Sequence, residues 1–444
     1  MPFYIRILNS SMLLLSIIHL ALGFIVSKNQ FISTYWGLGI LFYGIIHIIR
    51  NKNRFEEASI FSAYIVGLEV LLRTVGASVL WEFGKYSAIL LLITGILVEG
   101  AKHLRINTLS VLYILCLLPS IYIIPDNGFT QLRFAISGNL SGPVCLFFSF
   151  LYFRRRIFES YHLSNLFKAL ILPICSQIGL IIARAPAYNN LTFSSEANFQ
   201  LSAGYGPNQV STLLGVGIVI IGISKIFQMK IYRHNIYDYI FATVSIGLAL
   251  LTFARGGVLA PLFAIFVGVI ISLRFKKENI KITKYMYLIL IIIGLGYFSS
   301  IFTQGLIDSR YMALANMGVE QGFLSGRTKI MAIDLNIFMD NPIMGVGPGS
   351  AHHLRYEYGY GAAVAAHSEF TRMLSEHGIF GLTSLFSIMS LSIIEYYKRK
   401  KVNKILLACF STFSLLTMFH SAFRIALAGY IYGLSYIILK TDRK

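Results

Sequence analysis

The pattern of hydrophobic and polar positions along the chain is dominated by long, continuous apolar runs separated by short polar stretches. A helix crosses the hydrocarbon core of a bilayer with about 17–25 apolar residues. We therefore predict an all-α polytopic membrane protein with about 12–14 transmembrane helices. The runs that support this prediction lie near 7–26, 31–49, 58–80, 86–101, 107–124, 139–153, 165–183, 207–224, 236–254, 257–273, 285–302, 375–397, 404–420 and 425–440.

The stretch from about 303 to 370 is the only sizeable polar region. Within it, isoleucines recur on one face of a predicted amphipathic helix over Thr328–Met339. Asp340-Asn341-Pro342 ends this helix, because proline cannot continue one. We predict three parts: an N-terminal transmembrane bundle of about 11 helices over 1–302 with an outer loop near 184–206, a loop region with short helices over 303–370, and C-terminal transmembrane helices over 371–444.

Composition and charge refine this picture. The chain is 56% hydrophobic and 13% charged, with a mean hydropathy of +0.69, which excludes an ordinary soluble enzyme. The net charge of +19 alone would also suit a nucleic-acid-binding protein. However, with a cytoplasmic N-terminus, 26 of the 38 Lys and Arg residues fall on the cytoplasmic side. This asymmetry predicts that both termini are cytoplasmic and that the 303–370 loop lies outside.

Three arginines remain at the outer ends of the predicted helices: Arg184, Arg255 and Arg327. Each one alone is as well explained by an arginine that anchors a helix end at the interface. Together they predict an anion site, because guanidinium groups bind phosphate oxygens bidentately and stay charged. Gly256, which follows Arg255, would let backbone N–H groups approach the same anion.

A second group of polar residues, His367-Ser368-Glu369, ends the long outer loop. Ser368 is predicted to be the N-cap of the next helix, on which Arg372 and Glu376 are spaced i,i+4. Imidazole titrates near neutrality, so His367 can accept the proton of a sugar hydroxyl. Glu369 is the alternative base, and a surface histidine without a role is the alternative to both.

The remaining ionisable residues predict neither a metal site nor a cofactor. The adjacent pair His352-His353 lacks the i,i+4 spacing of helical metal ligands. Glu69 and Arg73 are spaced i,i+4 inside an apolar run and are expected to neutralise each other, or to line a proton or substrate path.

Four sequence elements resemble those of the O-antigen ligase and polymerase superfamily. The stretch from Arg327 to Gly349 resembles its hallmark loop, and His367-Ser368 followed by Gly378 and Gly381 matches its H-[NSQ]-x9-G-x-x-G motif. Gly206-Pro207-Asn208 resembles the G-x-PN element, and Ala254-Arg255-Gly256 resembles the S-R-[GA] element, with Ala in place of Ser. All four fall on the side predicted to be outside.

This resemblance implies a GT-C-like glycosyltransferase of the bacterial inner membrane with a periplasmic active site. Its donor would be a glycan on undecaprenyl diphosphate, and its acceptor lipid A–core or another glycan. His367 would be catalytic. Arg184 and Arg255 would contact the diphosphate, Arg327 would bind donor or organise the loop, and Asn208 and Gly347 would complete the binding set.

The same features leave four functional alternatives, one of which is a non-catalytic assembly partner in an envelope complex. A ligase is favoured because the His367 motif fits that pattern fully, and a polymerase shares the motifs. A transporter of the same lipid-linked glycan would also suit a basic, many-helix protein, but it predicts two similar halves, and the sequence shows no internal repeat. A single inverting displacement, with arginines rather than a metal stabilising the leaving group, is the expected chemistry.

Overall fold

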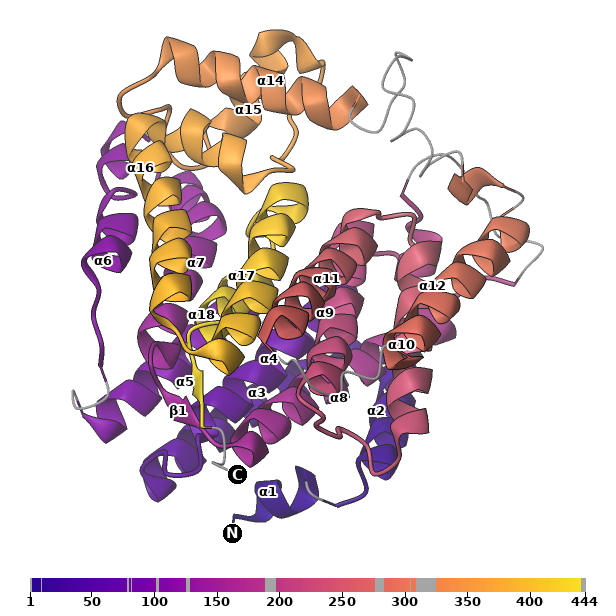
Figure 1. Cartoon of the computed structure of the whole chain (residues 1–444). Coiled ribbons are helices and arrows are strands. Elements are labelled where there is room, and N and C mark those ends of the chain that lie inside the picture. Colours follow the sequence, from indigo (N-terminus) through magenta and orange to yellow (C-terminus); the bar gives the residue numbers. More distant parts are fainter. Residues whose placement is uncertain are drawn as a thin grey trace.

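A computed structural model describes residues 2–8, 10–77, 80, 82–100, 104–124, 128–187, 197–275, 283–303, 305–308 and 325–440. These residues are helical almost throughout (Figure 1). The elements of the N-terminal half are α1 (Phe3–Leu8), α2 (Met12–Lys28), α3 (Gln30–Asn51), α4 (Glu57–Thr74), α5 (Phe83–Glu99), α6 (Thr108–Leu115), η2 (Pro119–Ile123), α7 (Phe129–Phe153), β1 (Ile157–Phe158) and α8 (Ser160–Arg184). Those that follow are η4 (Gln200–Ser202), α9 (Pro207–Ile226), α10 (Asn235–Leu251), α11 (Gly256–Phe275), α12 (Thr283–Phe302), α14 (Ser325–Asp340), α15 (Ala351–Arg355), η5 (Tyr356–Tyr360), α16 (Glu369–Lys398), α17 (Lys401–Ser421), α18 (Leu427–Leu434) and β2 (Ile438–Leu439).

The helices confirm the prediction of an all-α polytopic membrane protein. Among the described residues, seven helices are long and apolar enough to cross a membrane. They are α3, α7 from Leu132 onward, α8, α9, α11, α16 and α17. Shorter apolar helices lie at Met12–Lys28, Thr108–Ile123, Asn235–Leu251 and Ile293–Phe302. A total of 12–14 spans stays a prediction.

The last predicted span, 425–440, is wrong as a continuous membrane helix. Its residues form only the eight-residue helix α18, followed by a turn and the short strand β2. Eight residues rise about 12 Å, well short of the roughly 30 Å hydrocarbon core. Every residue of α18 is buried in the protein, so its apolar character reflects internal packing rather than contact with lipid.

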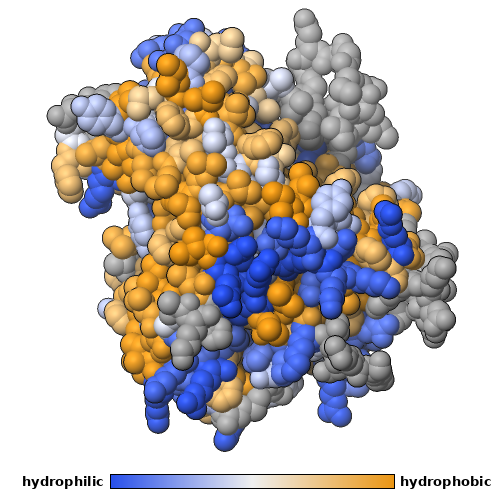
Figure 2. Space-filling view, turned by 60° about the vertical axis from the view of Figure 1, so that its left-hand side comes forward, coloured by the Kyte–Doolittle hydropathy of each residue, from blue (hydrophilic) through white to orange (hydrophobic). Residues whose placement is uncertain are grey.

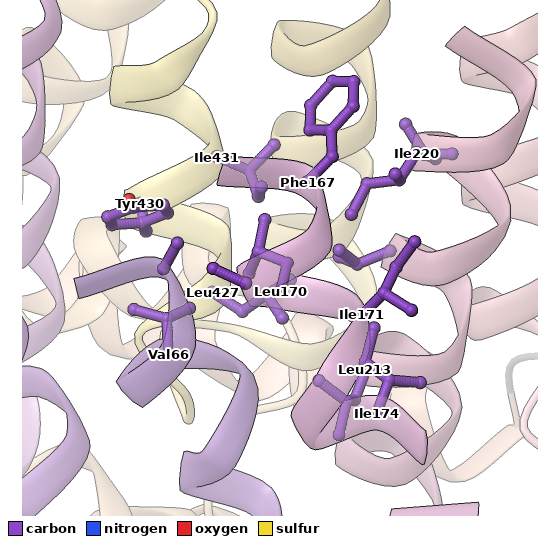
Figure 3. Close-up of a cluster of buried hydrophobic side chains, with 14 of the residues drawn as sticks. Val66, Phe167, Leu170, Ile171, Ile174, Leu213, Ile220, Leu427, Tyr430 and Ile431 are labelled. Atoms are coloured by element: carbon purple, nitrogen blue, oxygen red, sulfur yellow. The ribbon is translucent and has the colours of Figure 1, made fainter. Parts of the chain in front are cut away.

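The centre of the bundle is an apolar cluster to which helices far apart in the sequence contribute. Val66 of α4, Phe167 and Leu170 of α8, Leu213 of α9 and Tyr430 of α18 meet there, all almost fully buried (Figure 3). Burying such side chains stabilises the fold by about 1.5–3 kcal/mol each. The C-terminal helix α18 is therefore part of the same core as the N-terminal helices.

The outer surface is apolar as well, as a bilayer requires. Large hydrophobic side chains on several helices are exposed, among them Leu97, Phe266 and Phe386 at 74%, 58% and 69%. Figure 2 shows one face of the molecule with hydrophobic residues over much of its area and hydrophilic residues gathered in patches. Such a surface is stable only against lipid or another apolar partner.

One end of the bundle carries a small cap made of α14, α15 and η5 (Figure 1). Helix α14 confirms the predicted amphipathic helix and ends at Asp340, ahead of Pro342. Its residues Ile333 and Ile337 pack against Ala351 of α15. Helix α1 and strand β2 lie at the opposite end of the bundle, so the two ends of the described chain share one side (Figure 1).

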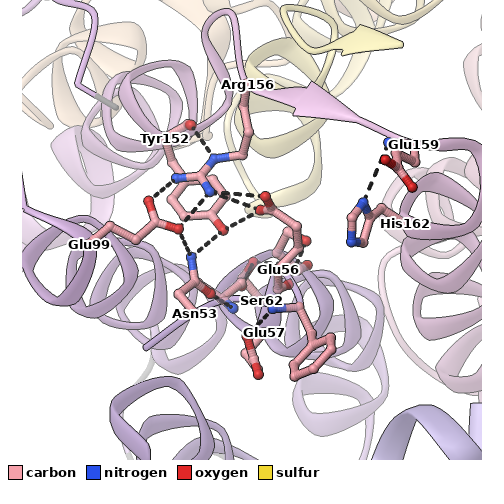
Figure 4. A network of polar contacts seen from close by, with 12 residues as sticks. Asn53, Glu56, Glu57, Ser62, Glu99, Tyr152, Arg156, Glu159 and His162 are labelled. Atoms are coloured by element: carbon pink, nitrogen blue, oxygen red, sulfur yellow. Dashed lines mark hydrogen bonds and ion pairs between the residues drawn. The ribbon is translucent and has the colours of Figure 1, made fainter. Parts of the chain in front are cut away.

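That opposite end is tied together by a buried ionic network (Figure 4). Arg156 pairs with Glu56 at 3.0 Å and with Glu99 at 2.6 Å. The Tyr152 hydroxyl donates to Glu56 at 2.9 Å, and the Asn53 side chain donates to Glu99 at 2.6 Å. The network joins the ends of α3, α4, α5 and α7, and β1 pairs in parallel with β2 directly beside it.

Candidate functional site

The glycine-rich loop after α14 and the kink in α16 form one structural unit. Gly378 interrupts α16 with φ +60° and ψ −140°. A helix break leaves N–H and C=O groups without intrahelical partners. The loop satisfies them: Ile379 N–H donates to Pro342 O at 2.8 Å, Val346 N–H donates to Ser375 O at 3.0 Å, and Gly347 N–H donates to Glu376 O at 3.0 Å. Backbone hydrogen bonds therefore join the glycine-rich loop to the helix that carries Gly378.

The close approach explains why glycine is needed on both sides of this contact. A Cβ on Gly378 would lie 2.5 Å from Ile343 O, and a Cβ on Gly345 would lie 2.4 Å from the carbonyl carbon of Glu376. Gly347 has φ +88° and packs against Ile124 and Ser120. Its N–H is already bonded to Glu376 O, so Gly347 supports the loop rather than offering a donor to a ligand.

His367 and Ser368 lie directly before the N-terminal end of α16. Ser368 occupies the predicted N-cap position with extended backbone, but its side chain makes no capping hydrogen bond. The preceding segment is fixed by Arg355, which donates to Val364 O at 2.8 Å. Arg355 in turn pairs with buried Asp334 at 2.7 Å, linking the cap to the start of α16.

The His367 ring is half-buried and surrounded by positive charge. Its Nδ1 is buried and has no hydrogen-bond partner among the described residues. Burial, with the neighbouring guanidinium groups of Arg424, Arg327 and Arg355, lowers the pKa of His367 to about 3. The imidazole is therefore neutral at physiological pH, with a lone pair available to accept a proton.

The structure joins two further predicted residues from distant parts of the chain. Arg327, near the start of α14, donates to the Asn208 side chain near the start of α9 at 3.1 Å. The charge of Arg327 acts on His420 at the end of α17 as well as on His367. Asn208, Arg327 and His367 thus belong to one region at the capped end of the bundle.

Arg255 and Arg184 lie at the ends of two different helices. Arg255 directly precedes α11 and is half-buried. The adjacent Gly256 lies against the His420 ring, where a Cβ would come within 2.3 Å of Cγ. Arg184, the last residue of α8, is exposed and donates to Thr74 O at 3.0 Å and to Ala203 O at 3.2 Å. Arg184 thereby bridges the ends of α8 and α4.

Glu369 has a different environment from His367. Its carboxylate is fully buried and pairs with Arg372, whose Nε donates to Oε2 at 3.0 Å. The Phe423 N–H donates to the same Oε2 at 3.2 Å. Arg372 also binds Glu376 at 2.6 Å, which confirms the predicted i,i+4 pair. Glu69 and Arg73 form the other predicted pair at 2.7 Å.

Two cavities lie next to the segment before His367. The larger, about 760 Å³, is between the cap and the outer part of α7, and His353, Arg355 and Glu357 contribute to its wall. The smaller, about 320 Å³, lies among the bundle helices. Asn139, Ala365, Ala366 and Arg372 line both cavities. The smaller cavity is also lined by Arg73, Glu82, Lys85, Gly138, Tyr205, Gln209, Glu369, Ala422, Phe423 and Arg424.

Several of these residues carry no motif that would have marked them in the sequence. Arg424 stands out only as an ionisable residue near a predicted outer turn, and Tyr205 and Lys85 have no such signal. Their positions in the wall follow from packing between elements far apart in the chain. In the described part of the chain, no three His, Cys, Asp or Glu side chains are grouped as ligands of a metal ion would be.

Comparison with known families agrees with this geometry. A family model described as O-antigen ligase matches residues 240–386, a range that contains Arg255, Arg327, His367 and the kink in α16. No curated protein matches the chain. Residues 240–386 therefore resemble an O-antigen ligase domain, and the predicted resemblance to the O-antigen ligase and polymerase superfamily is confirmed.

Proposed function

We propose that the protein transfers a glycan from undecaprenyl diphosphate to an acceptor hydroxyl at the periplasmic face of the bacterial inner membrane. The family match supports a ligase- or polymerase-type function in general. The finer statement rests on one observation: a neutral histidine, His367, lies among Arg327, Arg355 and Arg424 at the capped end of the bundle. This pairs a base with cations suited to a phosphorylated leaving group.

In the proposed mechanism, His367 accepts the proton of the acceptor hydroxyl. The hydroxyl oxygen attacks the anomeric carbon of the donor from the face opposite the diphosphate. The bond between that carbon and the diphosphate oxygen breaks, and undecaprenyl diphosphate leaves with the electron pair. One displacement of this kind inverts the anomeric configuration.

The arginines act on the charge that grows on the leaving diphosphate. Fixed guanidinium groups stabilise such charge without reorganising, and each is worth several kcal/mol in a site that excludes water. We assign Arg255 and Arg327 to the diphosphate. Asn208 would orient Arg327 through their hydrogen bond. Arg184 would hold the outer ends of α4 and α8 in place beside the donor.

His367 is the better base than Glu369. Both Glu369 oxygens already accept hydrogen bonds, from Arg372 and from the Phe423 N–H. A carboxylate so occupied would have to break an ion pair before it accepted a proton. We therefore assign Glu369 the role of fixing the start of α16, and with it the position of His367.

A ligase remains favoured over a polymerase, and both over a transporter. Ligase and polymerase differ in acceptor: lipid A–core for the first, a second lipid-linked glycan for the second. A transporter would move the donor across the bilayer without changing it and would need no base at His367. These three activities give different products and can be separated directly.

The test is transfer by the purified full-length protein in nanodiscs. Undecaprenyl-diphosphate-linked glycan is supplied with lipid A–core or with a second lipid-linked glycan, and products are analysed by mass spectrometry. We expect His367→Ala to reduce transfer by about 10²–10⁴-fold, the usual contribution of a general base. His234→Ala, at an exposed position beside α10, is the matched control and should keep wild-type transfer. Wild-type transfer by His367→Ala would remove the proposed base.

A further inference from the structure

The backbone just before His367 is held by two arginines. In the segment 364–366, Arg355 donates to the first carbonyl at 2.8 Å. Nη2 of Arg424 donates to the other two carbonyls, at 3.4 Å and 2.8 Å. The two arginines come from different elements, α15 and the turn between α17 and α18. The position of His367 therefore depends on both guanidinium groups.

Arg355 is a fixed anchor. It is 1% exposed and pairs with Asp334 at 2.7 Å. Asp334 also accepts a hydrogen bond from Thr371 at 2.8 Å. A buried guanidinium with a buried carboxylate partner does not change partners readily, because either charge left alone in the interior would be strongly unfavourable.

Arg424 differs from Arg355 in having no acidic partner. Among the described residues, no carboxylate lies within 4.0 Å of its guanidinium, and its hydrogen bonds go to carbonyl groups through Nη2. A guanidinium carries five N–H donors. The remaining donors of Arg424 leave it free to bind an anion at the same time as it holds the segment 364–366.

Arg424 lines the cavity of about 320 Å³, and among the described residues it is the one cation of the wall without a carboxylate partner. The other cations of the wall are Arg73, Lys85 and Arg372. Glu82 pairs with the first two, at 2.8 Å and 2.7 Å, and Glu369 pairs with the third. Arg73 and Arg372 also pair with Glu69 and Glu376, which do not line the cavity, so ion pairs neutralise these three cations. The charge of Arg424 is the one left for a phosphate group of a phosphate or diphosphate ester.

We propose that Arg424 binds a phosphate group of the lipid diphosphate donor in this cavity and, through the carbonyls of 365 and 366, couples donor binding to the position of His367. The identity of the donor rests on the proposed function. Arg424 is thus a binding and positioning residue. A bound phosphate would fix the orientation of its guanidinium and so the backbone that carries the base.

The proposal is tested by donor binding and kinetics on the full-length protein in nanodiscs of zwitterionic lipid. Arg424→Gln keeps N–H donors for the carbonyls but loses the charge, and Arg424→Ala loses both. The control is Arg133→Ala, an exposed arginine of α7 whose guanidinium lies over the Phe134 ring. The probes are undecaprenyl diphosphate and inorganic pyrophosphate.

We expect Arg424→Gln to weaken binding of undecaprenyl diphosphate and raise the donor KM by about tenfold or more, with a smaller loss of kcat. Arg424→Ala should lose kcat as well, because the carbonyls of 365 and 366 are also released. Pyrophosphate should displace undecaprenyl diphosphate from the wild-type protein and from Arg133→Ala. It should displace only poorly the undecaprenyl diphosphate that Arg424→Gln still binds. A role in folding alone would not split KM from kcat in this way.

Wild-type binding of undecaprenyl diphosphate by both Arg424 variants would overturn the proposal, and so would equal competition by pyrophosphate in wild type and Arg424→Gln. Thermal unfolding of each variant shows whether it is folded, and the Gln variant is the one expected to keep the wild-type midpoint. Failure of the proposed function is distinguishable. It appears as full transfer by His367→Ala, whereas failure of this inference appears as unchanged donor binding with His367→Ala inactive.

Discussion

The low pKa of His367 has two opposing effects on its action as a base. Its low pKa, about 3, keeps the ring neutral and able to accept a proton, yet it also makes the ring a weak base. Burial is the larger cause, and the charges of Arg424 and Arg327 come next. An anionic donor bound beside these arginines would offset their charge. The base should therefore become stronger only when the donor is present.

The first prediction concerns the pH dependence of transfer. A histidine pKa lowered in the folded protein means that the neutral base persists to lower pH than in a free histidine. We expect kcat/KM, which reports the free enzyme, to show no loss assignable to His367 between about pH 7 and about pH 5. In kcat, which reports the donor complex, the acid limb should lie at higher pH, because the bound diphosphate raises the pKa of His367.

Arg327→Gln checks the cause of this shift. Removing one of the surrounding charges should raise the pKa of His367, so the acid limb of kcat/KM should move to higher pH than in wild type. The donor is the same in both proteins, so its own ionisation contributes equally. A wild-type acid limb already near about pH 6.5 would mean that the arginines do not act on the base.

At the scale of single residues, the sequence identifies candidate site residues better than it identifies their hydrogen-bond partners. The motifs point to His367 and Arg327, because histidine and arginine have distinctive chemistry at these spacings. They do not reveal that Arg327 donates a hydrogen bond to Asn208 or that the Phe423 N–H donates one to Glu369. The residues of these two pairs lie 119 and 54 positions apart in the sequence. Such pairs result from tertiary packing, and no periodic pattern in the sequence predicts them.

At the scale of elements, the kink in α16 is the central feature of the site. The glycine-rich loop docks on it through backbone hydrogen bonds, and the first turns of α16 then carry His367 at their outer end. The loop and the kink each leave backbone groups that the other satisfies. The glycine-rich loop and the kink in α16 therefore stabilise each other's backbone conformation.

The second prediction is that Gly378→Ala is disruptive. The backbone at φ +60° and ψ −140° is strained for any residue with a Cβ, and that Cβ would meet Ile343 O at 2.5 Å. We expect a loss of about 1–3 kcal/mol from the backbone alone, and more from the contact. The measurement is the thermal unfolding midpoint in detergent, together with transfer activity.

Gly39→Ala provides the matched control. Gly39 is exposed on α3, has ordinary helical backbone, and has open space where a Cβ would be placed. Alanine there should be neutral or raise stability by about 0.5–1 kcal/mol, because alanine favours helix. If Gly378→Ala had the same unfolding midpoint and transfer activity as Gly39→Ala, the contact between the glycine-rich loop and α16 would not be what holds the site together.

The sequence predicts elements well where a run is both apolar and long. Helices α8, α9 and α11 begin and end within a few residues of the runs near 165–183, 207–224 and 257–273. The run 425–440 fails because hydrophobicity alone does not distinguish a lipid-facing span from a chain buried among other helices. Helix α18 is of the second kind: Gly429 and Gly433 pack directly on the α7 backbone.

At the scale of the whole molecule, a group of exposed basic residues lies at the end opposite the candidate site. Arg155, Lys398 and Lys400 are exposed at the α7–α8 and α16–α17 turns, whereas His367 and Arg327 lie at the capped end. Helix α1 and strand β2 share the first end (Figure 1). The positive-inside rule applied to this arrangement predicts that the cap is periplasmic.

The third prediction tests this orientation by cysteine labelling in intact cells. The four native cysteines, Cys116, Cys145, Cys175 and Cys409, are all buried, so they should give little background and can stay in place. Met339→Cys, at a position 71% exposed on α14, should react with a membrane-impermeant maleimide added outside, once the outer membrane is permeabilised. Lys400→Cys, exposed in the α16–α17 turn, should react only after the inner membrane is opened. The reverse pattern would place the base and its arginines in the cytoplasm, where a periplasmic acceptor could not reach them, and the proposed function would fail together with the orientation.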